Sequence, residues 1–64
     1  MTNKELIKYY KDYNARYAKL CECIYDCKVA NNMKHYATLI KIRFAMKTII
    51  ECIEKIAKLE GIEL

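Results

Sequence analysis

Apolar and aromatic residues in the first half of the chain recur with the period of an α-helix. Spacings of four and three separate the members of one stripe, which are Leu6, Tyr10, Tyr13, Tyr17, Leu20, Ile24 and Cys27. Such spacings keep one face of a helix apolar, whereas a half-buried strand needs a period of two. Thr2, followed three residues later by Glu5, matches the sequence that caps helix N-termini. The pattern predicts a helix over about residues 3–30.

The second half of the chain repeats the pattern with different residues. Gly61 follows its last turn, a place where glycine ends many helices by adopting a left-handed backbone. We therefore predict a second helix over about residues 33–60, and we expect its apolar stripe to face the first helix. This stripe comprises Leu39, Ile42, Met46, Ile49, Ile53 and Ile56.

Asn31 and Asn32 interrupt the helical pattern between the two stripes. Asparagine tolerates the left-handed conformation that ends a helix, and it is also a favourable N-cap. The chain has one glycine and no proline, so it has few turns, and a fold made only of strands is excluded. The predicted fold class is all-α: a two-helix antiparallel hairpin in a single domain over residues 1–64, with its turn at residues 31–32.

The apolar residues exceed what two helices can cover by packing on each other. Large exposed apolar patches are rare on monomers and usually mark interfaces. We therefore expect a homodimer in which two hairpins form a four-helix bundle with coiled-coil packing. The additional apolar positions beside the two stripes are Ile7, Ala18, Cys21, Tyr25, Ala45, Ile50, Cys52 and Ala57.

The composition is mildly basic, with a formal net charge of +4 at pH 7. The first residues lead into a charged helix and not into an apolar signal segment, and the apolar runs fall far short of the ~20 residues that cross a membrane. We expect a cytoplasmic protein with reduced cysteines and no membrane partner. Abundant lysine, isoleucine, tyrosine and asparagine are typical of AT-rich genomes, which indicates a bacterial or phage origin.

The four cysteines do not form a recognisable metal-binding motif. Cys23 and Cys27 are one helical turn apart and His35 lies near the turn, but the C-x-x-C knuckle of structural zinc sites is absent. We expect the cysteines to pack as small hydrophobic residues, and we predict no metal and no cofactor. The chain has one histidine and no serine, and a hairpin has no sheltered cleft, so we also predict no catalytic residues and no small-molecule ligand.

Four tyrosines stand among basic residues in the first helix: Tyr9, Tyr10, Tyr13 and Tyr17. Aromatic and basic side chains in this arrangement can stack on and hold single-stranded nucleic acid. Three of the four, however, lie on the apolar stripe, where tyrosines usually pack in the core with the phenol oxygen at its edge. We therefore expect these three to be core residues.

The distribution of charge singles out the turn end of the hairpin, because no acidic residue lies between Asp26 and Glu51. On the second helix, Phe44 and Ile40 point away from the predicted stripe. Aromatic residues and arginines are enriched at the hot spots of protein interfaces. The alternative is that Ile40 and Phe44 pack against another helix. The predicted partner-binding residues are Lys34, Ile40, Lys41, Arg43, Phe44 and Lys47.

These observations favour a small non-enzymatic binding protein that acts as a regulator, inhibitor or adaptor. It would dock a helical surface on a partner protein with an acidic surface. One alternative is an RNA- or DNA-binding dimer that uses the basic turn end. A second alternative is a module whose only role is oligomerisation.

Overall fold

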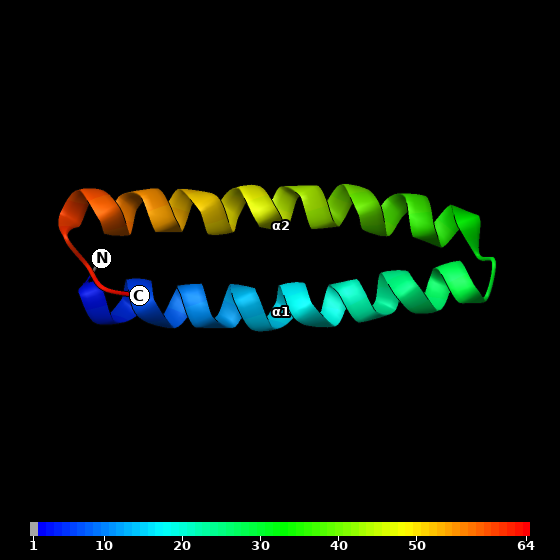
Figure 1. Cartoon of the computed structure of the whole chain (residues 1–64), viewed down its shortest axis with the longest axis horizontal. Helices are drawn as coiled ribbons and strands as arrows, with labels where there is room; N and C mark the ends of the chain where they lie inside the picture. Colours follow the sequence, from blue (N-terminus) through cyan, green and yellow to red (C-terminus); the bar gives the residue numbers. More distant parts are fainter. Residues whose placement is uncertain (1) are drawn as a thin grey trace.

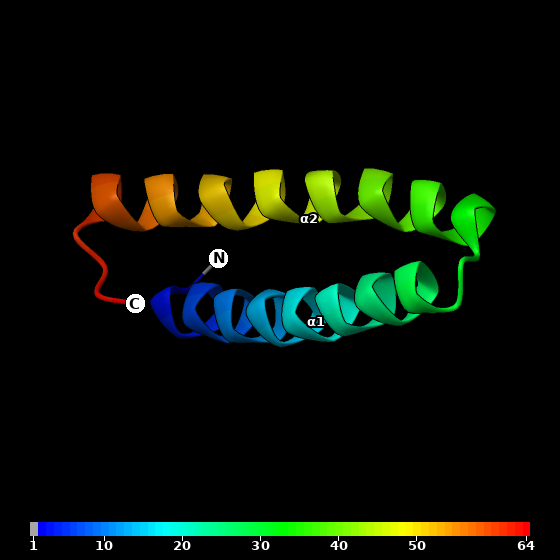
Figure 2. The same cartoon turned by 45° about the vertical axis from the view of Figure 1, so that its right-hand side comes forward.

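Two long antiparallel helices make up the computed structural model, which describes residues 2–64 (Figure 1). Helix α1 spans Asn3–Val29 and helix α2 spans Met33–Glu60, and they lie side by side in both views (Figures 1 and 2). The predicted all-α hairpin is confirmed. The molecule measures 44 × 15 × 15 Å, with both chain ends at the end opposite the turn. Neither helix has a segment long and apolar enough to cross a membrane.

Each helix begins at a side chain that caps its first turn. Thr2 has an extended backbone, and its Oγ1 accepts a hydrogen bond from the Glu5 N–H at 3.2 Å. The Asn32 side chain does the same for α2, because its Oδ1 accepts from the His35 N–H at 3.4 Å. These bonds satisfy backbone donors that have no partner within the helix. The N-caps predicted from Thr2 and from the asparagine pair are confirmed.

Each helix ends at a residue with a left-handed backbone. Asn31 has φ +57° after α1, and Gly61 has φ +67° after α2. The backbone N–H of the following residue then reaches back along the helix: Asn32 donates to the Cys27 carbonyl and Ile62 to the Ala57 carbonyl. Both ends are therefore Schellman motifs, which supply partners for the last free carbonyls. The motif after α2 also returns Ile62 to the core.

The core lies between the helices and is concentrated near the chain ends. Leu6, Ile53 and Ala57 form its buried cluster, against which Tyr10, Tyr13 and Ile62 pack. Ile24 and Ile50 are also buried, and every buried residue of the described chain is hydrophobic. Within residues 2–64 no large side chain is fully buried. The core of a single hairpin is therefore small, as expected for so short a chain.

The stripe of α2 that faces α1 differs from the predicted stripe. Every residue of what we call the inner stripe is buried or half-buried, whereas Ile42, Ile49 and Ile56 remain 44%, 40% and 47% exposed. The prediction that these three isoleucines face α1 is wrong. Ala57 lies in the buried cluster with Leu6, and Tyr10 and Tyr13 pack against that cluster, so the face of α2 that meets α1 is turned by one residue from the predicted face. The inner stripe comprises Tyr36, Leu39, Arg43, Met46, Ile50, Ile53 and Ala57.

Candidate protein-binding surface

Phe44 lies on the outer side of α2 and is 76% exposed, more than any other aromatic side chain in residues 2–64. Three of the predicted lysines, Lys34, Lys41 and Lys47, are exposed on the same helix. The hydroxyl of Thr48, one turn after Phe44, donates to the Phe44 carbonyl at 3.0 Å. The helix backbone therefore holds Phe44 in place while its ring has no cover from the hairpin.

The two remaining predicted residues are less accessible. Ile40 and Arg43 are half-buried, and Arg43 belongs to the inner stripe. The expectation that the hairpin leaves Ile40 uncovered is wrong, because the turned seam brings this edge of α2 towards α1. Arginine can bury its aliphatic stem while its guanidinium stays in water, which makes it tolerable at the margin of a core. The exposed part of the surface is therefore Phe44 with Lys34, Lys41 and Lys47.

Electrostatics single out the same region. The acid-free stretch Cys27–Ile50 covers the end of α1, the turn and most of α2. Because the helices are antiparallel, Lys28 at the end of α1 lies at the same end of the hairpin as Lys34. Glu22 and Asp26 also lie in the last turns of α1, so the positive charge at the turn end belongs mainly to its α2 side. Such a field attracts acidic partners and speeds their encounter.

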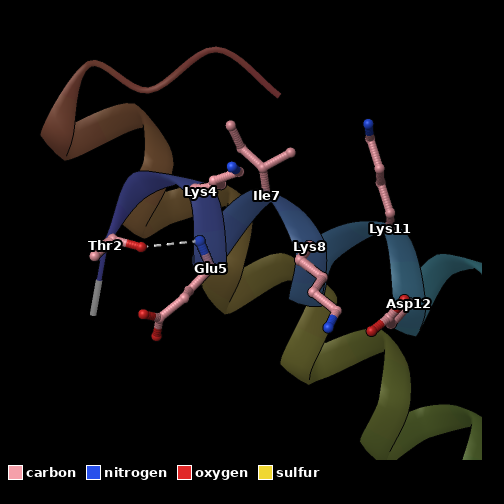
Figure 3. A pocket seen from close by; sticks show the side chains of 7 residues that line it. All are labelled: Thr2, Lys4, Glu5, Ile7, Lys8, Lys11 and Asp12. Carbon is pink, nitrogen blue, oxygen red and sulfur yellow. Dashed lines mark hydrogen bonds between the residues drawn. The ribbon is translucent and has the colours of Figure 1, made fainter.

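The recesses of the surface are shallow, and two of them lie at the end of the hairpin opposite the turn. One is lined by side chains around the first turns of α1, including half-buried Ile7 and exposed Lys8 and Lys11 (Figure 3). Another runs between the helices and is lined by Leu6, Tyr9, Tyr13, Ile53 and Ile56. The first surrounds the outside of a single helix, and the second is an apolar groove. Neither combines a sheltered volume with converging polar groups, which is the usual build of a small-molecule site.

The cysteines are spread along both helices. Cys21 and Cys27 are half-buried, whereas Cys23 and Cys52 are exposed, and all four are free. The expectation that they pack in the core is wrong for Cys23 and Cys52, because each lies beside the seam and not in it. Among residues 2–64, no three histidine, cysteine or acidic side chains come together as metal ligands would.

Three tyrosines of α1 occupy the core positions that the sequence predicts. Tyr10, Tyr13 and Tyr17 are half-buried in the seam, while Tyr9 is 46% exposed. The Tyr10 hydroxyl donates to Glu54 Oε2 at 3.4 Å, which links the edge of α1 to α2. The Arg16 guanidinium carbon lies 5.7 Å from the centre of the Tyr13 ring, within the range of a cation–π contact. The rings of Tyr10, Tyr13 and Tyr17 are therefore used within the hairpin, whereas Tyr9 and Tyr25 are exposed.

A second surface on α2 was not among the predicted site residues. We call it the outer stripe, because all of its members are exposed although none is charged. Each of its first six members directly precedes a residue of the inner stripe. Two interleaved heptad patterns on one helix are the signal that could have revealed it from the sequence. The outer stripe comprises Thr38, Ile42, Ala45, Ile49, Cys52, Ile56 and Leu59.

Comparisons with known proteins give no match: no family model, no curated protein and no solved structure is similar to this chain at a significant level. The physical chemistry of the surfaces is therefore the basis for a functional proposal.

Proposed function

We propose that this chain is a small non-enzymatic binding protein that docks the outer side of α2 on a partner protein with an acidic surface. The observation that carries the proposal is Phe44, a 76% exposed aromatic side chain within a stretch that has no acidic residue. A regulator, inhibitor or adaptor could act in this way, because covering part of a partner is sufficient for each of these roles.

The surface has the composition of an interface hot spot. Phe44 supplies an apolar anchor, and Lys41 and Lys47 supply a charged rim on either side of it along α2. In many interfaces a few such anchors contribute most of the binding free energy, while rim charges steer the encounter. An acidic partner is favoured because four basic residues of α2 precede its first acid, Glu51.

The test uses purified full-length chain immobilised as bait in a cell lysate, with and without nuclease. The variant is Phe44→Ala, and the matched control is Tyr25→Ala, which removes another exposed aromatic side chain without changing the charge; Tyr25 is 67% exposed on α1. Bound proteins are quantified by mass spectrometry, and the dissociation constant of each purified candidate is then measured.

We expect acidic proteins that bind the wild type and Tyr25→Ala equally and are lost from Phe44→Ala. The expected weakening is about 1 to 3 kcal/mol. Nuclease should not change their capture. The proposal is wrong if Phe44→Ala retains the same proteins with the same dissociation constants.

Nucleic acid is the second candidate, favoured by the basic turn end alone. Its test is fluorescence anisotropy with labelled single-stranded RNA and duplex DNA over a range of salt concentrations. Nucleic-acid binding would weaken steeply with salt, because neutralised phosphates release counterions. Binding of this kind that Phe44→Ala leaves unchanged would favour the second candidate over the first.

The outer stripe, and not the Phe44 side of α2, is the surface available for the self-association that the sequence predicts. Phe44 is absent from the outer stripe, so two hairpins paired through that stripe would each keep a free Phe44.

A further inference from the structure

The outer stripe of α2 has the regular shape of a helix–helix interface. Its spacings alternate between four and three, which is the heptad repeat of coiled coils. Large and small side chains also alternate along it: Ile42, Ile49 and Ile56 are separated by Ala45 and Cys52. The isoleucines therefore project as knobs about 10.5 Å apart, with a shallow hole between neighbouring knobs.

The outer stripe faces the direction in which a second neighbouring helix would lie in a four-helix bundle. A shift of one residue turns the helix by about 100°, so the outer stripe lies about a quarter turn from the seam with α1. In a square four-helix bundle each helix contacts two neighbours that are about a quarter turn apart. Helix α2 thus has one apolar stripe for each of two neighbouring helices, and within the hairpin α1 is one of these neighbours.

The hairpin exposes more surface than a compact monomer of the same mass. Its accessible surface is 5304 Å², whereas a compact monomer of this mass exposes about 4300 Å². Its radius of gyration is 14.3 Å, against about 10.7 Å for a compact domain of this length. The excess of about 1000 Å² is comparable with the ~800 Å² that each partner contributes to a standard interface.

We propose that the outer stripe is a two-fold interface between two copies of this chain, in which α2 packs antiparallel to α2 of the second copy. In this orientation one register places every isoleucine opposite a small residue. Ile42 faces Cys52 of the second copy, Ile49 faces its Ala45, and Ile56 faces its Thr38. Facing large and small residues interdigitate and give layers of equal volume, whereas a parallel pair would set isoleucine on isoleucine and alanine on alanine.

The chemistry of the stripe selects a second copy as its occupant. An uncharged stripe needs an uncharged partner surface, and a two-fold interface requires a surface that complements itself, which this alternation of sizes provides. The one hydroxyl on the stripe is already satisfied, since Thr38 Oγ1 donates to the Lys34 carbonyl at 3.2 Å. Burying Thr38 in an interface therefore leaves its hydroxyl with a hydrogen-bond partner.

The two-fold axis of this arrangement places both α1 helices on the same side of the α2 pair. The assembly then joins two hairpins through their α2 helices, and Phe44 stays outside this contact. The inference is independent of the proposed function, because pairing uses Ile49 and its stripe while partner binding uses Phe44.

The first test is sedimentation equilibrium of the full chain, with circular dichroism of each sample. We expect wild-type dimers at micromolar concentration. Ile49→Asp should raise the dimer dissociation constant at least about 100-fold, because it buries an unpaired charge in the interface. Thr48→Asp is the matched control, with the same new charge one residue off the stripe, and it should remain dimeric.

The outcomes of this test are distinct. Loss of helicity in Ile49→Asp but not in Thr48→Asp also supports the interface, since a hairpin that folds only when paired would behave in this way. A folded wild-type monomer at tens of micromolar would overturn the proposal. Equal association of wild type and Ile49→Asp, or equal loss in the two aspartate variants, would overturn it as well.

The second test measures the orientation by disulfide cross-linking. In a background with Cys21, Cys23 and Cys27 replaced by alanine, Cys52 remains as the only thiol. Adding Ile42→Cys should give a disulfide-linked dimer under mild oxidation, because residues 42 and 52 of opposite copies face each other; removing either thiol should abolish the link. Efficient linking through Cys52 alone would overturn the antiparallel arrangement. Phe44→Ala should leave both tests unchanged, so a failure of partner binding would not be mistaken for a failure of pairing.

Discussion

The two helices of this hairpin have similar lengths but different faces. Helix α1 has 27 residues and one continuous apolar stripe, all of which is buried or half-buried against α2. Helix α2 has 28 residues and two stripes, of which α1 covers one. The outer side of α1 is rich in charge, with Lys8, Lys11 and Lys19 exposed. Between Met33 and Ile50, the exposed side of α2 has no acid and carries Phe44.

This difference indicates a division of roles between the helices. The folded hairpin covers the apolar stripe of α1, although Tyr9, Tyr25 and Val29 beside that stripe stay exposed. Helix α2 exposes large apolar side chains in two directions, and those of the outer stripe form a regular repeat. Amphipathic helices with one apolar face are stabilised by one neighbour, and an extra apolar face usually marks a further contact. This is why we propose α2 as the binding helix, with the outer stripe for a second copy and the Phe44 side for a partner protein.

The largest expected effect is a loss of stability when isoleucines of the two stripes of α2 are replaced by alanine. Ile53→Ala empties a position that is 8% exposed, and it should lower the free energy of unfolding by about 2 to 4 kcal/mol at any protein concentration. Ile49→Ala should cost less in dilute samples, and its cost should grow with concentration, because the proposed dimer would stabilise the wild type by mass action. Urea unfolding at two concentrations, followed by circular dichroism, measures both. Equal and concentration-independent costs would contradict the division into two stripes.

The cysteines lie in both helices and give the next effect. Replacing Cys21, Cys23, Cys27 and Cys52 together by alanine should leave the helical signal near that of the wild type. The stability loss should be about 1 to 2 kcal/mol, mainly from the half-buried pair on α1. Circular dichroism and thermal melting measure it. Collapse of the helical signal, or stoichiometric zinc in elemental analysis of the wild type, would show that the thiols are structural ligands.

The ends of the two helices provide a smaller effect. Asn31 adopts φ +57° after α1, where the Cβ of most residues makes a left-handed backbone unfavourable. Asn31→Ala should therefore lower the free energy of unfolding by about 1 kcal/mol, while Asn31→Gly should be neutral or stabilising, as glycine already serves at the end of α2. Thermal melts of the two variants decide this. A more stable alanine variant would contradict the role given to the asparagine.

The smallest effect concerns the polar link between the helices. The Tyr10 hydroxyl donates to Glu54 at an exposed edge, where water can replace the bond. Tyr10→Phe keeps the ring in the seam and should change the free energy of unfolding by less than about 0.5 kcal/mol. A loss above about 1 kcal/mol in urea unfolding would show that this bond, and not the packing of the ring, holds this part of α1 to α2.

The candidate surfaces could be predicted from the sequence only in part. Phe44 is exposed as predicted, because it points away from both apolar stripes of α2, and a small rotation of the helix does not bring it to α1. Ile40 could not be placed, since it lies at the edge of the seam and a small rotation of α2 decides whether it is covered. The binding role of either residue stays a prediction.

The amino-acid sequence by itself determined the elements of this protein and their ends. The helical period, the caps at Thr2 and Asn32 and the left-handed residues Asn31 and Gly61 depend on interactions within a few residues, and local interactions can be read in order along the chain. The tertiary structure alone decided which side of α2 meets α1. Leu39, Met46 and Ile53 belong to both the predicted stripe and the inner stripe, so the sequence of α2 does not decide which of the two faces α1. That decision depends on packing against the side chains of α1, where Leu6 and the tyrosines lie beside the small Ala57 of α2. That choice left Ile42, Ile49 and Ile56 uncovered, and the proposed pairing of two copies depends on these three side chains.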